Sequence, residues 1–548
     1  MNNEKNYRRH RVIYLILVGL FTLCYCRTLY AQVIKGGERK AMAERQYEYI
    51  KDIEEQKYLL LDRNGKNLLE YTTKYYAVID QFIFGMFNKE KDNKDLLLLK
   101  YTLREYNIDY KVPEITNVRI NNELVYEIGK ETYDKLKEIK GVKGFYTYTY
   151  TTVNRADTWK VENIISNIKN TNDNSLKKND SLELQIFNKI KNNEAAKVIF
   201  ERGRDESIVN ESTMLPQSNV NVKLTLDKNI EDSIYEVLNK DTYSKYQQIG
   251  VTLMDSKSGK ILAMTQKNNR LPNINLGAGT ENGFQAGSIF KTIVLETGFE
   301  LGKISLADEY TCKKYKDSLC EHKIHGTINT EEAFVQSCNN AFEGIGNKVG
   351  YNNCMILAKA QGLYNNVLGL QCEVKGDYVP RNLAKGEGRG LVIGQDMRIT
   401  PVQALAIANT VVNGGVYVKP YIIDSYVDDN NNVIEQFSKV ERTVIKSSTA
   451  NILKSEMIQV VSRGTGIEAK INGMEIGGKT GTSQRNETSE SGIDESHSDG
   501  WFVGFFKVKN KYYTMVVFVK DINVVEEEAG TTAVPVFKDV VQTIKKYL

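Results

Sequence analysis

Apolar residues are concentrated in one long run close to the N-terminus. Residues 12–26, VIYLILVGLFTLCYC, are almost all apolar and follow an arginine-rich stub, residues 1–11. The run is shorter than the ~20 residues that usually span a bilayer, so a signal peptide or a soluble core helix would also fit it. Residues 27–30 can extend it, and no small-residue cleavage motif follows. We therefore expect a retained anchor over residues 12–30, with the basic stub in the cytoplasm and the rest of the chain outside.

Alternating apolar and polar positions predict strands in the second half of the chain. Residues 249–266, IGVTLMDSKSGKILAMTQ, predict two strands joined by a turn, and residues 500–520 predict a second hairpin. Close to the C-terminus, the apolar residues of positions 536–548 fall on one helical face. Strand pairs from both ends of one region, with helices between them, predict an α+β domain built on an antiparallel sheet.

A change in composition near residue 215 predicts a domain boundary. Residues 31–215 are rich in Lys, Asn, Glu and Tyr, mix short helical and strand patterns, and carry no catalytic motif. A chain of 548 residues is long enough for two or three domains. We therefore expect a non-catalytic domain over residues 31–215 and a catalytic domain over residues 216–548.

The charge balance argues against nucleic-acid binding. The chain has 73 Lys and Arg residues against 69 Asp and Glu residues, a formal charge of only +4, which lacks the basic excess typical of nucleic-acid binding. Its seven cysteines are too few for a disulfide framework in a chain of this length. Its four histidines leave little from which to build a Ser-His-Asp site.

A serine and a lysine three residues apart form the first candidate catalytic pair. Ser288 and Lys291 lie in GFQAGSIFKTIVLE, at the start of a predicted helix with apolar neighbours. Positions i and i+3 share a helix face, burial favours the neutral amine of a lysine, and that amine can accept the serine proton. The spacing alone is weak, because Ser175 and Lys178 repeat it in polar surroundings. The apolar context therefore indicates the activated nucleophile.

Two further motifs add candidate binding groups. The segment QSCNNAF contains Ser337 and Asn339, which could hydrogen-bond the lysine and a substrate amide. Cys338 between them is interpreted as a buried packing residue rather than a second nucleophile. A predicted strand in EIGGKTGTSQ supplies Lys479, Thr480, Gly481 and Thr482. The lysine offers a positive charge, the hydroxyls can hold a carboxylate, and the glycine lets a substrate backbone approach.

The three motifs, S-x-x-K, S-x-N and K-T-G, follow one another at separations of 49 and 142 residues. This is the pattern of penicillin-recognising serine acyltransferases, and the chain resembles a class B penicillin-binding protein, a monofunctional D,D-transpeptidase of peptidoglycan synthesis. Other stretches similar to that family include LDRNGKNLL, NVKLTLD, LVIGQDMRITPVQALAIANTVVNGG, VSRGTG and SDGWFVGFF. They cover the catalytic half densely and the first half sparsely.

The resemblance implies an α+β fold of the penicillin-binding and serine β-lactamase-like type, with an antiparallel sheet between helical layers. Residues 31–215 would form an elongated α+β pedestal, and one N-terminal transmembrane helix would anchor the chain in the cell membrane with the catalytic domain on the extracytoplasmic side. The implied partners are peptidoglycan stem peptides, β-lactam antibiotics, the membrane and a glycosyltransferase of wall synthesis. Nucleic acid is not among them, and catalysis would require no cofactor.

The resemblance also implies a role for each motif residue. Ser288 would be the acylated nucleophile and Lys291 its general base. Ser337 would pass a proton to the leaving D-alanine, and Asn339 would hold the amide of the stem peptide. An amine from a neighbouring strand would then capture the acyl-enzyme, and β-lactams would trap the first step.

In the third motif, the resemblance implies that Lys479, Thr480 and Thr482 bind the terminal carboxylate of the substrate. The backbone N–H groups of Ser288 and Thr482 would form the oxyanion hole. The chain departs from the family where Ala286 replaces a proline, where Lys57-Tyr58 replaces R-G, and where GQD replaces the commoner G-Q-G.

Three other functions fit part of this pattern. A serine β-lactamase shares the first and third motifs but is about half as long and has no pedestal. A β-lactam sensor would carry a multi-spanning segment or an H-E-x-x-H motif before the binding domain, and neither is found here. A non-catalytic scaffold of wall synthesis would tolerate loss of motif residues, whereas all three motifs are intact.

A cysteine- and histidine-rich segment offers a candidate metal site. The stretch YTCKKYKDSLCEHKIHGT contains Cys312, Cys320, His322 and His325, and such residues could ligate a structural Zn²⁺. The wide spacing of the cysteines also allows a Cys312–Cys320 disulfide outside the cell or unpaired thiols. A metal here would fix the loop that leads into the second motif.

Overall fold

The computed structural model describes nine stretches of the chain, with side chains outside residues 2–10 and 484–497: residues 2–30, 47–88, 94–113, 122–314, 319–320, 324–378, 388–488, 494–523 and 527–548. Contacts group the chain into two compact units. The first comprises residues 1–57, 71–153 and 194–217, and the second comprises residues 58–70, 154–193 and 218–548. The boundary at residue 215 stays a prediction.

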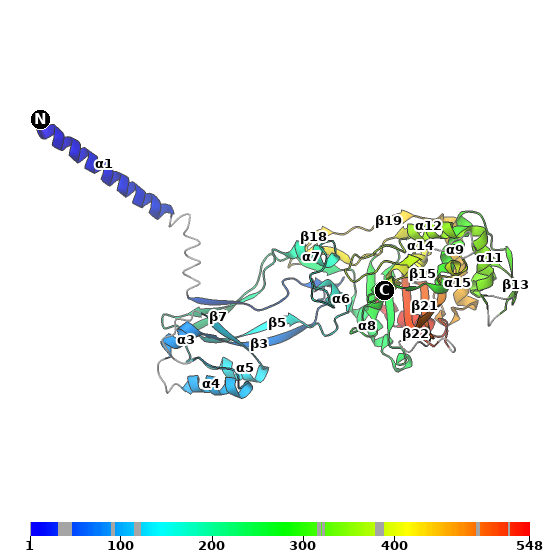
Figure 1. The fold of residues 1–548 in the computed structure, drawn as a ribbon, viewed down its shortest axis with the longest axis horizontal. Coiled ribbons are helices and arrows are strands. Elements are labelled where there is room, and N and C mark those ends of the chain that lie inside the picture. The colour runs from blue at the N-terminus through cyan, green and yellow to red at the C-terminus, as the bar shows by residue number, and fades with distance from the viewer. Residues whose placement is uncertain are drawn as a thin grey trace. The chain divides into compact units, whose positions relative to one another are not determined.

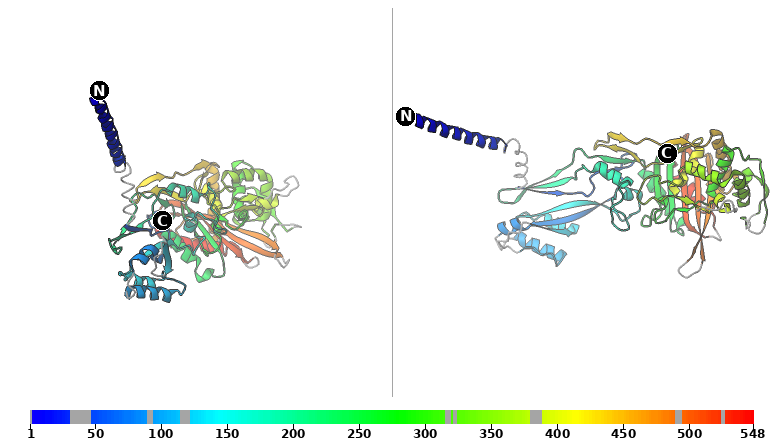
Figure 2. Two further views of the ribbon diagram at one scale, coloured as in Figure 1. Left: turned by 60° about the vertical axis from the view of Figure 1, so that its left-hand side comes forward. Right: turned by 45° about the horizontal axis from the view of Figure 1, so that its top comes forward.

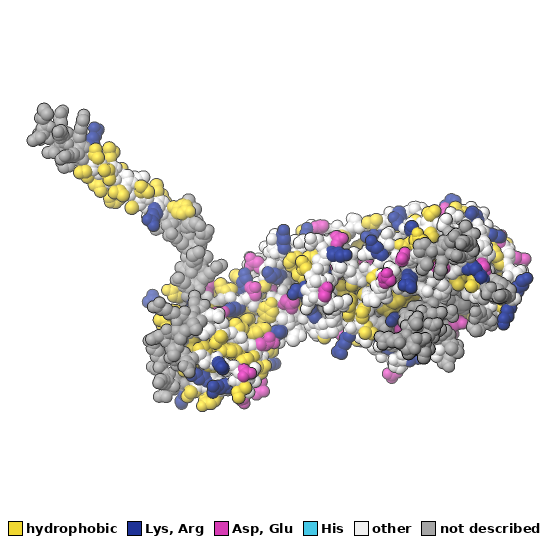
Figure 3. All heavy atoms as spheres, in the orientation of Figure 1, with side chains coloured by type: hydrophobic (Ala, Val, Ile, Leu, Met, Phe, Trp, Pro, Cys, Tyr) yellow, Lys and Arg dark blue, Asp and Glu magenta, His cyan; other side chains and the backbone are white. Residues whose placement is uncertain are grey.

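The chain begins with a long helix, α1 (Asn2–Leu29). Its stretch Arg11–Leu29 has a mean hydropathy of 2.0 and is long and apolar enough to cross a membrane, by length and composition. The large apolar side chains of this stretch are exposed to solvent along the helix (Figure 3). Exposure of so many apolar groups in water is unfavourable, which fits the prediction of an anchor over residues 12–30.

The first unit contains two three-stranded antiparallel sheets. In one sheet β3 (Tyr71–Asp80) lies between β4 (Glu123–Ile128) and β5 (Phe145–Val153). Helices α4 (Lys94–Tyr106) and α5 (Lys130–Lys137) lie beside this sheet (Figure 2). They share an apolar core with it. The remaining elements are α3 (Gln81–Phe87) and the sheet of β1 (Glu48–Asp52), β6 (Lys197–Arg202) and β7 (Ile208–Met214).

A five-stranded antiparallel sheet forms the centre of the second unit (Figure 1). Its order is β10-β9-β22-β21-β20, so strands from the start and the end of the unit pair at its middle. This confirms the two predicted hairpins and the α+β fold. The strands are β9 (Ile249–Asp255), β10 (Ile261–Gln266), β20 (Ile476–Thr488), β21 (Asp494–Val508) and β22 (Lys511–Ile522).

Helices cover both faces of this sheet. On one face α8 (Lys228–Leu238) and α16 (Ala533–Ile544) close an apolar core with alternate residues of the strands. Asp227 caps α8 by accepting hydrogen bonds from Asn229 N and Ile230 N. On the other face lie α9 (Lys291–Glu300) and α14 (Pro401–Val412). This face carries the three motifs.

Smaller elements complete the second unit. Three of them form a small sheet next to the candidate site, in the order β11 (Phe284–Gln285), β15 (Met397–Ile399) and β14 (Asp377–Tyr378). The other strands are β2 (Leu60–Leu61), β8 (Asn221–Leu224), β12 (Glu309–Cys312), β13 (Gly326–Asn329), β16 (Val416–Val418), β17 (Ile423–Val427), β18 (Val433–Gln436) and β19 (Glu441–Thr443). The other helices are α6 (Val161–Ile165), α7 (Leu182–Ile190), α10 (Thr330–Val335), α11 (Asn339–Val349), α12 (Tyr351–Ala360), α13 (Arg389–Val392) and α15 (Ser447–Arg463).

Candidate active site

Ser288 lies in a short 3-10 turn, Gly287–Phe290, that leads directly into α9. Gly287 has a φ of +56°, and a Cβ there would lie 2.7 Å from Thr482 O, so only glycine lets this turn approach β20 so closely. Trp501 Nε1 donates a hydrogen bond of 3.0 Å to Gln285 O and holds the segment before the turn. The half-buried Ser288 is thereby fixed beside the third motif, and its Oγ hydrogen-bonds no residue that the structure describes.

Lys291 is fully buried at the first position of α9. Its Nζ donates hydrogen bonds to Ser337 O at 2.7 Å, to Asn339 Oδ1 at 2.6 Å and to Ser337 Oγ at 3.2 Å. Burial lowers the pKa of Lys291 to about 7, while the thiol groups of Cys338 and Cys320 oppose the shift when ionised. A lysine with this pKa is partly neutral at physiological pH and can act as a base.

Ser337 joins the first and third motifs. It lies in the turn between α10 and α11 with a φ of +58°, which is rare and unfavourable for a residue other than glycine. Its Oγ contacts Lys291 Nζ on one side and accepts a hydrogen bond of 2.9 Å from Lys479 Nζ on the other. This backbone conformation therefore holds one hydroxyl between two buried amines.

Lys479 is fully buried on β20 and also donates to Thr480 O at 2.9 Å. Burial, and then the charge of Lys291, hold its pKa well below the ordinary value for lysine. Two ammonium groups that share one hydroxyl repel each other, so loss of the proton from one stabilises the proton on the other. The pair therefore favours one neutral and one charged amine.

The remaining motif residues are held in place by contacts with neighbouring groups. Asn339 Nδ2 donates to Leu319 O at 3.1 Å. A hydrogen bond of 2.6 Å joins the Thr480 and Thr465 hydroxyls, and Thr482 Oγ1 accepts from Ala529 N at 3.2 Å. A Cβ on Gly481 would lie 2.8 Å from Ile289 Cγ2, so glycine here makes room for the Ser288 turn.

The structure thus brings all eight predicted catalytic and substrate-binding residues to one locus, although they come from three segments of sequence. Sequence reasoning singled out neither Thr465 nor Trp501, the hydrogen-bond partners of Thr480 and of the nucleophile segment. Thr465 lies in VSRGTG, one of the stretches on which the family resemblance rests. That resemblance could have singled out Thr465 as a site residue.

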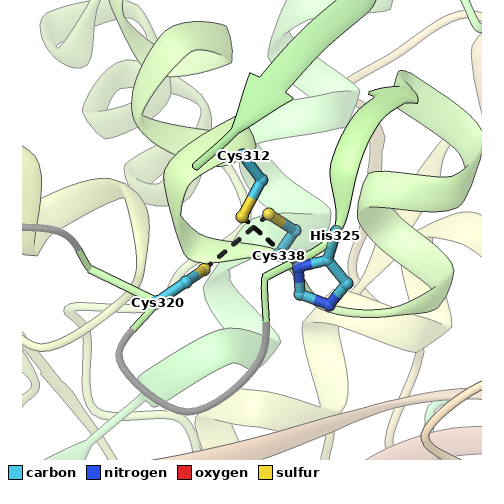
Figure 4. Close-up of side chains that lie close together, drawn as sticks. All are labelled: Cys312, Cys320, His325 and Cys338. Atoms are coloured by element: carbon cyan, nitrogen blue, oxygen red, sulfur yellow. Dashed lines mark hydrogen bonds between the residues drawn. The ribbon is translucent and has the colours of Figure 1, made fainter. Parts of the chain in front are cut away.

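A second cluster lies directly behind the S-x-N motif (Figure 4). Ligand atoms of Cys312, Cys320, His325 and Cys338 all lie within 4.8 Å of one another. Of the predicted metal residues, His322 lies outside the described residues. Cys338, interpreted from the sequence as a packing residue, is buried as expected but also faces the cluster.

Two distances in this cluster match tetrahedral zinc geometry. Zn–S bonds of about 2.3 Å and Zn–N bonds of about 2.0 Å at tetrahedral angles separate two sulfurs by about 3.8 Å and a sulfur from a nitrogen by about 3.5 Å. Cys320 Sγ lies 3.8 Å from Cys338 Sγ, and Cys312 Sγ lies 3.5 Å from His325 Nδ1. The hydrogen bond between the two thiols lowers the pKa of Cys320 and raises the pKa of Cys338, so the pair favours a thiolate at Cys320. All four cluster residues fit a zinc ion.

The comparisons with known proteins all point to the same protein family. The family described as penicillin binding protein transpeptidase domain matches residues 249–542. Stage V sporulation protein D of Bacillus subtilis (strain 168) is 24% identical over 97% of this chain and 85% of its own length. A peptidoglycan D,D-transpeptidase FtsI homolog of Mesostigma viride is 22% identical over 99% of this chain and 97% of its own length.

Two solved structures have the same fold as this chain. A peptidoglycan synthetase from Bifidobacterium adolescentis ATCC 15703 has a TM-score of 0.63 at 17% identity, over 91% of this chain and 96% of that one. Penicillin-binding protein 3 from Mycobacterium tuberculosis, complexed with ampicillin, has a TM-score of 0.61 at 16% identity, over 91% and 96% of the two chains.

Proposed function

Because the chain belongs to the penicillin-binding protein transpeptidase family, we propose that it cross-links peptidoglycan stem peptides through an acyl-enzyme on Ser288. One observation carries the proposal: two buried lysines, Lys291 and Lys479, meet at Ser337 Oγ beside a serine held against β20. An arrangement of buried amines around a nucleophile is costly to fold, and it serves general base catalysis. Catalysis of this kind requires no cofactor.

In the first step, the neutral amine of Lys291 accepts the Ser288 Oγ proton while Oγ attacks the carbonyl carbon of the penultimate D-alanine. The N–H groups of Ser288 and Thr482 stabilise the oxyanion. A proton passes through Ser337 Oγ to the departing amine, the peptide bond breaks, and free D-alanine leaves an ester on Ser288. The hydrogen bond from Ser288 to Lys291 forms in the substrate complex, since such bonds are often absent without ligand.

In the second step, the amine of a neighbouring stem peptide attacks the ester. It loses a proton to Lys291, Ser288 Oγ leaves and takes a proton back, and a new peptide bond replaces the ester. Lys479, with the hydroxyls of Thr480 and Thr482, binds the substrate carboxylate, and Asn339 holds the substrate amide. β-Lactams would acylate Ser288 in the same way, and the ampicillin complex of penicillin-binding protein 3 supports this part of the proposal.

We extend the proposal to the organisation of the chain. Residues 1–11 would form a cytoplasmic stub, residues 12–30 a single-pass anchor, residues 31–215 the pedestal, and residues 216–548 the extracytoplasmic transpeptidase domain. The apolar stretch Arg11–Leu29 supports the anchor, and the three arginines of the stub support this orientation. A separate glycosyltransferase would supply the glycan strands.

Labelling by a fluorescent penicillin tests the proposed function. The detergent-solubilised full chain is incubated with the penicillin, and retention of the label is followed after excess drug is removed. We expect a covalent label that persists much longer than the labelling takes. Fast loss of the label would instead identify a β-lactamase, and absence of any label would identify a non-catalytic scaffold.

The buried lysine predicts a pH dependence of acylation. Neutral Lys291 is the active form and its pKa is lowered to about 7, so the acylation rate should rise as pH increases through that value and level off above it. The measurement is the second-order rate of penicillin acylation between about pH 5.5 and 8.5, with thermal unfolding recorded at each pH. A flat profile would exclude Lys291 as the base.

We also propose that Cys312, Cys320, His325 and Cys338 hold a structural zinc ion, as the separations of their ligand atoms support. Cys338 lies between Ser337 and Asn339, so a metal at this position would fix the backbone of the S-x-N motif. The zinc supplies no step of the reaction.

Removal of the metal should destabilise the protein. We expect the purified full chain to contain about one zinc per molecule and to lose several degrees of unfolding temperature with a strong chelator, since structural zinc contributes directly to folding. Cys320→Ser should remove the zinc, whereas Cys354→Ala, which alters a buried cysteine outside the cluster, should retain it. Elemental analysis and thermal unfolding measure both effects. A metal-free wild-type chain with unchanged stability would contradict the zinc site.

A further inference from the structure

A cavity of about 300 Å³ lies next to the nucleophile segment and contains none of the motif residues. Among the residues that line it are Thr280, Gln285, Arg398 and Lys520. Gln285 lies on β11 three residues before Ser288, and Arg398 lies directly opposite it on β15. Two cationic side chains thus face one hollow beside the site described above.

The cavity is within reach of a peptide bound at Ser288. Three peptide units span at most about 11 Å, so the Cα atom of Gln285 is no farther than that from the Cα atom of Ser288. Val519 on β22 lies opposite Gly500, which lies opposite Thr482. Because neighbouring strands are about 4.8 Å apart, the backbone next to Lys520 is about 10 Å from Thr482. About three extended residues of a ligand would bridge the two places.

Some polar groups of the cavity lack hydrogen-bond or ion-pair partners among the residues that the structure describes. The exposed Arg398 guanidinium makes no hydrogen bond or ion pair with the residues that the structure describes. Lys520 Nζ pairs with Asp521 at 3.3 Å but keeps 37% of its side chain exposed. Asp377 lies opposite Arg398 on β14, yet its Oδ1 accepts a hydrogen bond from Tyr378 N. The Arg398 guanidinium and part of the Lys520 side chain therefore remain open to a ligand.

Gln285 adds a hydrogen-bond acceptor to the two cations. Its Nε2 donates to Gln395 O at 2.9 Å, which fixes the orientation of the amide. Its Oε1 is buried and has no hydrogen-bond partner among the described residues. A buried carbonyl oxygen without a donor is unfavourable, and an N–H group of a ligand would supply the donor. An amide beside a carboxylate is the ligand chemistry that satisfies all three groups.

We propose that this cavity binds a free carboxylate of a stem peptide, two or three residues away from the reacting carbonyl or amine. The inference rests on the proposed function and deepens it, because it assigns a preferred substrate class: stem peptides whose carboxylate is free rather than amidated. Arg398 would hold the carboxylate through paired N–H groups, Lys520 would add charge, and Gln285 Oε1 would accept from the neighbouring peptide N–H.

The test compares paired peptides on the detergent-solubilised full chain. The donor pair is a D-Ala-D-Ala pentapeptide with either a free carboxylate or a carboxamide on its second residue, and the acceptor pair differs in the same group. D-Alanine release measures the donor arm and cross-linked product measures the acceptor arm. We expect Arg398→Gln to lower kcat/KM about tenfold or more for the carboxylate peptide of one arm, and Lys520→Gln to have a smaller effect in the same arm.

The carboxamide peptides should react equally with wild type and both variants, and Lys439→Gln, an exposed lysine on another strand connection, should change nothing. Arg398 is exposed, so its variant should fold, and thermal unfolding checks this. Equal losses with carboxylate and carboxamide peptides, or no loss in either arm, would overturn the inference while penicillin labelling of wild type still upholds the proposed function. A wild-type chain without labelling would overturn both.

Discussion

Replacing Ser288 with alanine should abolish covalent labelling of the full chain by a fluorescent penicillin. The side chain supplies the oxygen that becomes the ester, and among the described residues Ser337 is the serine whose hydroxyl contacts both Lys291 and Lys479. Removal of the serine nucleophile from a serine protease costs on the order of 10⁶-fold in rate. We therefore expect labelling and D-alanine release both to fall below detection.

The variant should remain folded, because Ser288 Oγ hydrogen-bonds no described residue and its loss leaves no buried group unpaired. Thermal unfolding within about a degree of wild type would establish this. Ser175→Ala is a matched control: Ser175 is exposed and is also followed by a lysine three residues later, and this variant should label normally. Persistent labelling of Ser288→Ala would refute the assignment of the nucleophile.

Local patterns were sufficient to predict much of the fold. The alternation in residues 249–266 and 500–520 predicts two hairpins that are present, and the apolar face after residue 536 predicts a helix that begins at Ala533. These elements are recognisable because their buried positions are apolar: the strands are largely apolar runs bounded by turns, and α16 buries one apolar face. Two-residue strands such as β11 (Phe284–Gln285) could not be predicted, since only pairing with β15, far along the chain, defines them.

The candidate site was predictable in its composition but not in its connections. The spacing of Ser288 and Lys291 is local, and the three motifs have a recognisable order. By contrast, the left-handed backbone of Ser337 and its position between two lysines depend on how α10, α11 and β20 pack. The place of Cys338 in the cysteine cluster was missed for the same reason, because its partners come from the β12–β13 hairpin and the loop between those strands.

The two buried amines explain why the site is sensitive to single changes. Each lysine donates hydrogen bonds to Ser337 in place of those to water, and burial without such partners would be strongly unfavourable. Lys479 serves best when charged and Lys291 when neutral, so the site requires that one proton be shared unequally between them. Loss of Lys291 should therefore remove the base and also change the environment of Lys479.

Replacing Lys291 with methionine should lower the acylation rate by about 10³-fold, within the range by which a positioned general base accelerates proton transfer. Methionine fills a similar volume without a titratable group. The variant leaves Asn339 Oδ1 and Ser337 O without their donor, which destabilises the fold, but it also removes a buried amine, which stabilises it. Penicillin acylation measured against pH should show both the lower rate and the loss of the rise near pH 7.

Lys291→Arg separates the role of base from the role of charge. Arginine restores a cation and hydrogen-bond donors next to Asn339 Oδ1, yet its guanidinium cannot lose its proton in a protein. If Lys291 acts as the base, the arginine variant should be as slow as the methionine variant, with the same flat pH profile. If Lys291 acts only by holding the S-x-N motif in position, the arginine variant should recover much of the rate. Recovery of activity in Lys291→Arg would therefore contradict the mechanism, because no neutral amine would then be needed to activate Ser288.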